Sequence, residues 1–301
     1  PNFLALYLQN PESQIMTEPT KPLAIDPSYP GFNIMLMGPS GTGKTYSIKS
    51  LAASGLEVFA LFLEPGLETL IGSYIDNNEP IPPNLHWHYL QPKTQGFDQL
   101  KKSADEIGKF DLAGLAKMKD INRSKNNQMF DVYTVLNDFH DQRTKKSFGS
   151  VDSWTNGAVL VIDSLSALNR IVMNMVIGTK AVKDMSDWGV AQTALMNLLH
   201  KLTSGCNCNL VLIAHVEREI DQVLGGIKLM PAVLGKAITS QIAQPFSDVI
   251  LTVREGDKFY WDTANSQADV KTRNLPIASK IPADFGQIVE KWEKRAQAAG
   301  A

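Results

Sequence analysis

The residues with the clearest chemical capability lie in one short stretch near the start of the chain. Residues 38–45 read Gly-Pro-Ser-Gly-Thr-Gly-Lys-Thr and fit the pattern G-x-x-x-x-G-K-[ST], which surrounds phosphate groups. Its glycines let backbone N–H groups turn inward, Lys44 can reach the β- and γ-phosphates, and the Thr45 hydroxyl can ligate Mg²⁺. The stretch therefore predicts a site for ATP and Mg²⁺. The predicted nucleotide-binding residues are Gly38, Pro39, Ser40, Gly41, Thr42, Gly43, Lys44, Thr45 and Tyr46.

The segments on both sides of this loop are of the kind needed to hold it. Residues 32–37 form a short apolar run typical of a buried strand. Residues 46–53 carry apolar side chains at helical spacing, so a helix N-terminus would add its partial positive charge at the phosphates. The order strand, glycine-rich loop, helix is the context that the motif requires.

Two carboxylates follow other predicted strands. The apolar run 158–163 ends in Asp163, which can enter the Mg²⁺ shell beside Thr45. The run 58–63 is followed by Glu64, which can polarise the water that attacks the γ-phosphate; the alternative is a role at the start of the next helix. Because Ser164 stands where many hydrolases carry a second acid, Glu64 is the better candidate for the catalytic base.

A histidine completes the predicted site. The apolar run 210–214 ends at His215, and the carboxyl ends of neighbouring strands meet at the ligand crevice of an open α/β sheet. There His215 can hydrogen-bond the γ-phosphate and report its loss; the alternative is a capped histidine in the core.

The bulk composition describes a globular protein without a dominant charge. The chain has 301 residues, of which 44% are hydrophobic and 20% charged, with a net charge of −2. The chain lacks the overall positive charge that is typical of a nucleic-acid-binding protein. Cys206 and Cys208 have no second Cys pair and His86 and His88 have no third ligand, so we expect reduced thiols and a plain strand rather than metal sites. No apolar run has the length of a membrane span, and we expect a cytoplasmic protein.

The chain divides into three predicted parts. Residues 1–30 are expected to be an N-terminal arm or disordered leader, in which Met16 could be the true initiator. Residues 31–290 would form the main domain, with a mostly helical insertion at 79–157 that is either solvated or a basic surface for DNA or a partner protein. Residues 291–301 would be the end of a terminal helix and a tail.

The order of these parts resembles the RecA-type ATPase core. It is most similar to the short RecA-like proteins of bacteriophages and prophages that act in DNA recombination and single-strand annealing. The resemblance rests on Gly38–Thr45, Phe62–Glu64, Leu160–Ser164, Ile213–Arg218, Pro231–Lys236 and Lys271–Arg273. It implies an α/β fold: a three-layer RecA-like P-loop NTPase core with a mainly parallel central sheet, a helical insertion and a C-terminal β-hairpin.

The resemblance also implies partners. ATP would lie between the protomers of a homo-oligomeric ring or filament, and Lys271 and Arg273 would reach the neighbour's γ-phosphate. The alternative for these two cations is a solvated loop pair. Residues 169–187 and 216–245 correspond to the DNA-binding loops of the family, although neither is strongly basic here.

The function expected from these features is Mg²⁺-dependent ATP hydrolysis, stimulated by single-stranded DNA, in phage recombination, replication or repair. The host cytoplasm would then be the location, and a phage protein is a possible partner. The main alternative is a nucleotide-dependent assembly protein with slow turnover. An AAA+-type remodelling ATPase is less favoured, because we recognise no C-terminal helical lid after the core. A small-molecule kinase is less favoured, because no arginine-rich lid segment follows residues 158–163.

Overall fold

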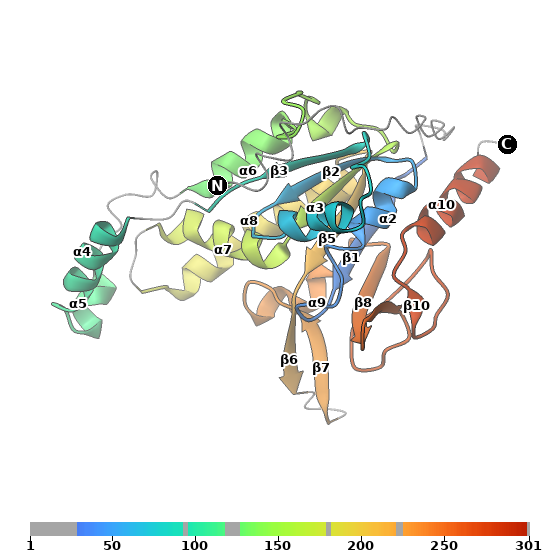
Figure 1. Cartoon of the computed structure of the whole chain (residues 1–301). Coiled ribbons are helices and arrows are strands. Elements are labelled where there is room, and N and C mark those ends of the chain that lie inside the picture. The colour runs from blue at the N-terminus through green and yellow to red at the C-terminus, as the bar shows by residue number, and fades with distance from the viewer. Residues whose placement is uncertain (1–28, 93–95, 118–126, 179–181, 221–224, 300–301) are drawn as a thin grey trace.

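A computed structural model describes residues 29–92, 96–117, 127–178, 182–220 and 225–299. Its centre is an eight-stranded sheet with the strand order β10-β9-β8-β1-β5-β4-β2-β3 (Figure 1). The six strands from β8 to β3 in this order pair in parallel, and β9 and β10 are antiparallel to their neighbours. The strands are β1 (Asn33–Met37), β2 (Glu57–Phe62), β3 (Leu85–Tyr89), β4 (Ala158–Asp163), β5 (Asn209–Ala214), β8 (Asp248–Glu255), β9 (Lys258–Asp262) and β10 (Ile281–Pro282).

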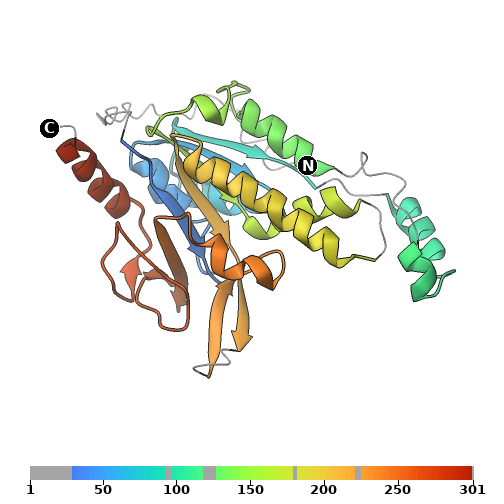
Figure 2. The same ribbon diagram turned by 180° about the vertical axis from the view of Figure 1, so that it is seen from behind.

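Helices cover both faces of this sheet. The helices are α2 (Ile48–Ala53), α3 (Leu67–Asp76), α4 (Phe97–Ile107), α5 (Leu112–Lys117), α6 (Gln128–Asn137), α7 (Leu165–Ile177), α8 (Met185–Ser204), α9 (Thr239–Ile242) and α10 (Gly286–Ala299). Side chains of α2, α3 and α10 share one apolar core with the sheet, and those of α6, α7 and α8 share the other. In Figure 1 α3 lies in front of the sheet, and in Figure 2 α8 does.

The central strands are apolar along their whole length because both of their faces are buried. In β4, Leu160 and Ile162 point to the core under α6, α7 and α8, whereas Val159 and Val161 point to the core under α2, α3 and α10. The predicted fold class is confirmed: three layers, a mainly parallel sheet, and a C-terminal hairpin formed by β8 and β9.

The strand order brings the predicted site residues to one edge of the sheet. β1 lies between β5 and β8, and β5 separates β1 from β4. Because these strands and β2 are parallel, the loops that follow them start at the same edge. A separate hairpin of β6 (Val216–Ile220) and β7 (Ile227–Pro231) leaves this edge directly after β5 and extends away from the main sheet (Figure 1).

The region predicted as a helical insertion has two structurally different parts. Its strand β3 belongs to the main sheet, and α6 contributes buried residues such as Met129 and Val132 to the core. By contrast, α4 and α5 stand apart from the sheet in both views (Figures 1 and 2). Neither apolar core contains a described side chain from residues 96–117. Phe97 is 91% exposed at the start of α4.

The loop after α6 covers the outer edge of β3. The backbone N–H of Gln142 donates to the Trp87 carbonyl oxygen at 2.9 Å. Its side-chain amide pairs with both backbone groups of Tyr89, at 3.0 and 3.1 Å. These contacts satisfy strand groups that would otherwise face solvent at the end of the sheet.

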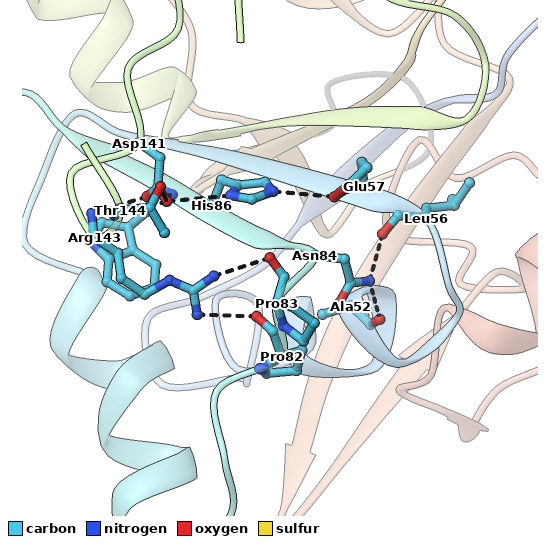
Figure 3. A network of polar contacts seen from close by, with 11 residues as sticks. Ala52, Leu56, Glu57, Pro82, Pro83, Asn84, His86, Asp141, Arg143 and Thr144 are labelled. Carbon is cyan, nitrogen blue, oxygen red and sulfur yellow. Dashed lines mark hydrogen bonds and ion pairs between the residues drawn. The ribbon is translucent and has the colours of Figure 1, made fainter. Parts of the chain in front are cut away.

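A polar network fastens this loop to the sheet (Figure 3). The imidazole of His86 lies between two carboxylates, with Nδ1 3.3 Å from Asp141 Oδ2 and Nε2 3.1 Å from Glu57 Oε2. The guanidinium of Arg143 donates to the carbonyl oxygens of residues 82–83, at 3.1 Å each. His86 therefore has a structural role, because it joins β2 and the loop to β3.

Candidate nucleotide-binding and catalytic site

The phosphate-binding loop is closed on one side by strands β8 and β9. A Cβ atom on Gly38 would lie 2.0 Å from the Thr252 hydroxyl oxygen of β8, so only glycine fits there without movement. At Gly43 a Cβ atom would lie 2.5 Å from the Phe259 ring of β9, and φ is +82°. The hydroxyls of Thr42 and Thr252 lie 2.5 Å apart. Gly38 and Gly43 are therefore required by the strands that pack against the loop.

Lys44 is buried and folds back onto its own loop. Its ammonium donates to the carbonyl oxygens of Gly38 at 2.9 Å and Pro39 at 2.7 Å. Burial lowers the pKa of Lys44 to about 8, although the nearby carboxylates of Asp163 and Glu64 oppose this shift. The side chain is placed at the mouth of the loop, where phosphate oxygens can replace the two carbonyls as its partners.

Thr45 and Asp163 form the expected pair of oxygen ligands. The Thr45 hydroxyl donates to Asp163 Oδ2 at 2.6 Å, which joins the loop to the end of β4. Burial raises the pKa of Asp163 to about 6. A hydroxyl and a carboxylate side by side fit Mg²⁺, which prefers oxygen ligands and completes its shell with water and phosphate.

Glu64 lies beside Ser164 and His215 at the same edge. The Leu63 N–H donates to the Asp163 carbonyl oxygen at 2.7 Å, so the chain segments after β2 and β4 start together. The Ser164 hydroxyl donates to Glu64 Oε1 at 2.5 Å, and His215 Nε2 lies 3.3 Å from the same oxygen. Hydrogen bonds from His215 and Ser164 lower the pKa of Glu64, so the carboxylate is ionised at neutral pH.

Four further residues contribute to the site, although the sequence analysis did not predict them as site residues. Ser164 contacts the proposed base, Thr252 and Phe259 pack against the glycine-rich loop, and the positive charge of Arg170 on α7 contributes to the lowered pKa of Glu64. Of these four, only Ser164 could have been recognised from the sequence, because it directly follows Asp163. The other three are brought in by tertiary contacts between distant segments.

Tyr46 and Phe259 form an aromatic surface beside the loop. Their ring centroids lie 5.8 Å apart with an interplanar angle of 50°. The Arg254 guanidinium lies 5.8 Å from the centre of the Phe259 ring. Tyr46 is 39% exposed, so this surface can accept the flat face of a base.

Lys271 and Arg273 do not join the site within one chain. Lys271 pairs with Val249 through backbone hydrogen bonds of 2.8 and 3.1 Å, and its ammonium donates to the Gln244 carbonyl oxygen. The Arg273 N–H donates to Asp248 Oδ1 at 2.8 Å, at the start of β8. The phosphate-binding loop follows the end of the parallel strand β1, so the two cations lie toward the opposite edge of the sheet.

The segments expected to bind DNA adopt different structures. Residues 165–177 and 185–204 are the helices α7 and α8, and residues 216–231 contain the β6–β7 hairpin. Two lysines of these segments could contact DNA but cannot be described: Lys180 lies outside the described residues, as does the side chain of Lys236.

None of the helices in the described part of the chain is long and apolar enough to cross a membrane.

Comparison with known proteins gives a family. Residues 31–274 match the family described as AAA domain. No curated protein matches the chain. Among solved structures, the chain is similar to an ATPase from the type III secretion system of pathogenic bacteria, with 13% identity and a TM-score of 0.36. That similarity covers 80% of this chain, which spans 61% of the length of the other. Because the family match extends over most of the sequence and includes the phosphate-binding loop, the chain belongs to the AAA domain family of P-loop ATPases.

Proposed function

We propose that the chain hydrolyses ATP with Glu64 as the base that activates the attacking water. The observation that carries this proposal is the convergence of three groups at one sheet edge: Lys44, the Thr45–Asp163 pair, and Glu64. Lys44 would bind the β- and γ-phosphates, and Thr45 and Asp163 would hold Mg²⁺. When bound, Mg²⁺ neutralises negative charge on the phosphates. His215 would donate to the γ-phosphate once Glu64 accepts a proton from water.

Substitution of Glu64 tests this assignment. Glu64→Gln keeps the size of the side chain but removes the base, so kcat should fall by about 100-fold or more while Mg·ATP binding is retained. Glu68→Gln is the matched control, because Glu68 lies four positions later, exposed in the first turn of α3. Full turnover in Glu64→Gln would remove Glu64 from the base role.

We further propose that single-stranded DNA stimulates this ATPase, in phage recombination, replication or repair. The proposal is supported by the position of the β6–β7 hairpin, which continues directly from His215 and extends away from the sheet. His215 would contact the γ-phosphate and is bonded directly to the first residue of β6. Loss of the γ-phosphate would therefore move His215 and, with it, the start of the hairpin. Arg218 is exposed on β6 and can contact a phosphate backbone.

The test is steady-state ATP hydrolysis with and without single-stranded DNA, at low and at high salt. We expect stimulation that high salt removes, since phosphate contacts release counterions. Arg218→Ala should lose part of the stimulation but keep the basal rate, and Lys294→Ala on α10 serves as the control. Tight ATP binding without any stimulation would instead favour the assembly protein with slow turnover. The exposed apolar side chains of α4, such as Phe97 and Leu100, are consistent with a protein partner in that case.

We also propose that Lys271 and Arg273 act on ATP bound by a neighbouring copy. Their distance from the loop of their own chain, at the opposite end of β8, supports an action in trans. Mixing provides the test. Lys44→Ala and Arg273→Ala proteins should each be inactive alone, and mixed oligomers should regain activity at sites that combine an intact loop with an intact arginine. A mixture as inactive as its components would contradict the proposal.

A further inference from the structure

The serine that follows Asp163 is fully buried and joins two strand ends. Ser164 lies at the junction of β4 and α7 with no exposed surface. Its hydroxyl donates to Glu64 Oε1 at 2.5 Å, a contact between residues 100 positions apart in sequence. Ser164 also accepts a weaker hydrogen bond of 3.4 Å from the Ala167 N–H, as the N-cap of α7.

The contacts of Glu64 distinguish its two carboxylate oxygens. Both the Ser164 hydroxyl and His215 Nε2 lie within hydrogen-bonding distance of Oε1. Within the described part of the chain, Oε2 has no hydrogen bond. An ionised carboxylate can only accept, so the hydroxyl proton of Ser164 must point at Oε1. Oε2 is thereby left to accept a proton from water.

The charges around Glu64 explain why an uncharged donor suits position 164. Asp163 at the end of β4 repels the Glu64 carboxylate, whereas Lys44 of the loop, His215 after β5 and Arg170 of α7 attract it. A second acid at position 164 would add repulsion beside Asp163. A hydroxyl instead holds Glu64 by donation and adds no charge.

We propose that Ser164 is a positioning residue that fixes Glu64 Oε1 and so presents Oε2 to the attacking water. This rests on the proposed role of Glu64 as the base. In the step that it serves, a water proton passes to Glu64 Oε2 and the water oxygen bonds to the γ-phosphorus. The bond from the γ-phosphorus to the β,γ-bridging oxygen breaks, giving ADP and inorganic phosphate. Ser164 stays protonated throughout.

The experiment compares Ser164→Ala with Ser164→Thr in the full chain, by kcat and KM for ATP. Loss of the hydroxyl should lower kcat by about 10- to 100-fold, the range for a misplaced catalytic group, with little change in KM. Threonine keeps the donor and should restore kcat to within about threefold of the wild type. Asp184→Ala removes the N-cap of another helix, α8, and should leave kcat unchanged.

The outcomes separate this proposal from the one on which it rests. A Ser164→Ala protein that binds ATP and turns over at the wild-type rate overturns the positioning role, even if Glu64→Gln is inactive. A Ser164→Thr protein that is folded but as slow as Ser164→Ala also overturns it, because the loss would then come from space and not from the hydroxyl. If Glu64→Gln itself keeps full turnover, the base assignment fails first, whatever Ser164 does.

Discussion

The protonation of Lys44 depends strongly on its surroundings. Its ammonium donates to two carbonyl oxygens of its own loop. Burial disfavours the charged form, which is why its pKa is lowered to about 8. Phosphate oxygens would reverse this effect, because they add negative charge at the same place.

Lys44→Ala should weaken Mg·ATP binding by roughly 30-fold or more, since a charge-assisted hydrogen bond contributes about 2 kcal/mol. In the wild type, affinity should decline as the pH rises through about 8, because the free lysine loses its proton there and must regain it to bind phosphate. Titration with a fluorescent ATP analogue measures both effects. Lys49→Ala in α2, which removes a charge paired with Glu79, is the control. Unchanged ATP affinity and turnover in Lys44→Ala would contradict the role of the loop.

Gly38 gives a second test at this scale. In Gly38→Ala the new Cβ atom would meet Thr252, at 2.0 Å from the hydroxyl and 2.8 Å from the backbone oxygen. We expect a loss of about 1–3 kcal/mol in the free energy of unfolding, the usual cost of overpacking, together with weaker ATP binding. Urea denaturation measures the stability. The control is Gly72→Ala in α3, where a Cβ atom would meet nothing within 4 Å and the change should be neutral or stabilising. Wild-type stability in Gly38→Ala would mean that β8 is free to move.

Among the larger elements, the loop over β3 depends on the charge of His86. Burial lowers the pKa of His86, but the hydrogen bonds with Asp141 and Glu57 outweigh it and leave the pKa raised. The pKa of Asp141 is lowered: burial opposes this, but hydrogen bonds from His86, Thr144 and backbone N–H groups prevail. A raised pKa of His86 and a lowered pKa of Asp141 both favour the charged forms. Both shifts are therefore those expected of a stabilising ion pair between β3 and the loop.

The stability contributed by His86 should therefore be complete below its unfolded pKa of about 6.5 and disappear as the pH rises through the folded value. Between those values the free energy of unfolding should fall by up to about 1.4 kcal/mol per pH unit. Chemical denaturation of wild type and His86→Gln at several pH values tests this, with the exposed His200→Gln as control. A stability difference between wild type and His86→Gln that does not change with pH would contradict the ion pair.

The pair of helices α4 and α5 should be dispensable for folding. The Gln128 side chain donates to the Gln91 carbonyl oxygen at 3.3 Å, so the chain leaves and re-enters the domain at neighbouring points. We expect that replacing residues 92–127 by a short Gly/Ser linker leaves the melting temperature and the basal ATPase rate unchanged. Met129→Ala in α6, which is fully buried, should by contrast cost about 2–5 kcal/mol. A large loss of stability in the linker variant would show that α4 and α5 support the core.

At the scale of the whole molecule, binding of Mg·ATP should increase the free energy of unfolding, because only the folded chain binds it. A nonhydrolysable ATP analogue with Mg²⁺, at 100 times its dissociation constant, should stabilise the fold by about 2.7 kcal/mol. The ATP analogue should therefore raise the melting temperature. Removing Mg²⁺ with EDTA should abolish most of this increase, and so should Asp163→Asn. An equal shift with and without Mg²⁺ would argue against the Thr45–Asp163 metal site. Scanning fluorimetry is sufficient for this comparison.

The sequence was most informative where a residue's role follows from a local pattern. The central strands could be predicted because burial on both faces makes them continuous apolar runs, as in residues 158–163. Lys44, Asp163, Glu64 and His215 could be placed together because the ends of parallel strands meet. Placement among phage proteins, and the trans role of Lys271 and Arg273, remain predictions.

Residues that act through distant contacts could not be predicted. Phe259 reaches the loop from a strand more than 200 positions later, and no local pattern marks it. The loop at residues 140–147 gave no sign of its role, because covering β3 depends on side chains such as Gln142 meeting a strand some 50 positions earlier. Composition alone described this region as polar and exposed.

The covered edge of β3 has a consequence for how copies of the chain can meet. At the other end of the sheet the last strand, β10, has only two residues, one of them Pro282. Neither end therefore offers a long row of free backbone groups to a strand from another copy. Filament growth by adding strands to the sheet, the route to amyloid, is disfavoured at both ends. An ordered polymer that grows at either end of this sheet must then be built from side-chain surfaces, and it should dissolve back into folded subunits.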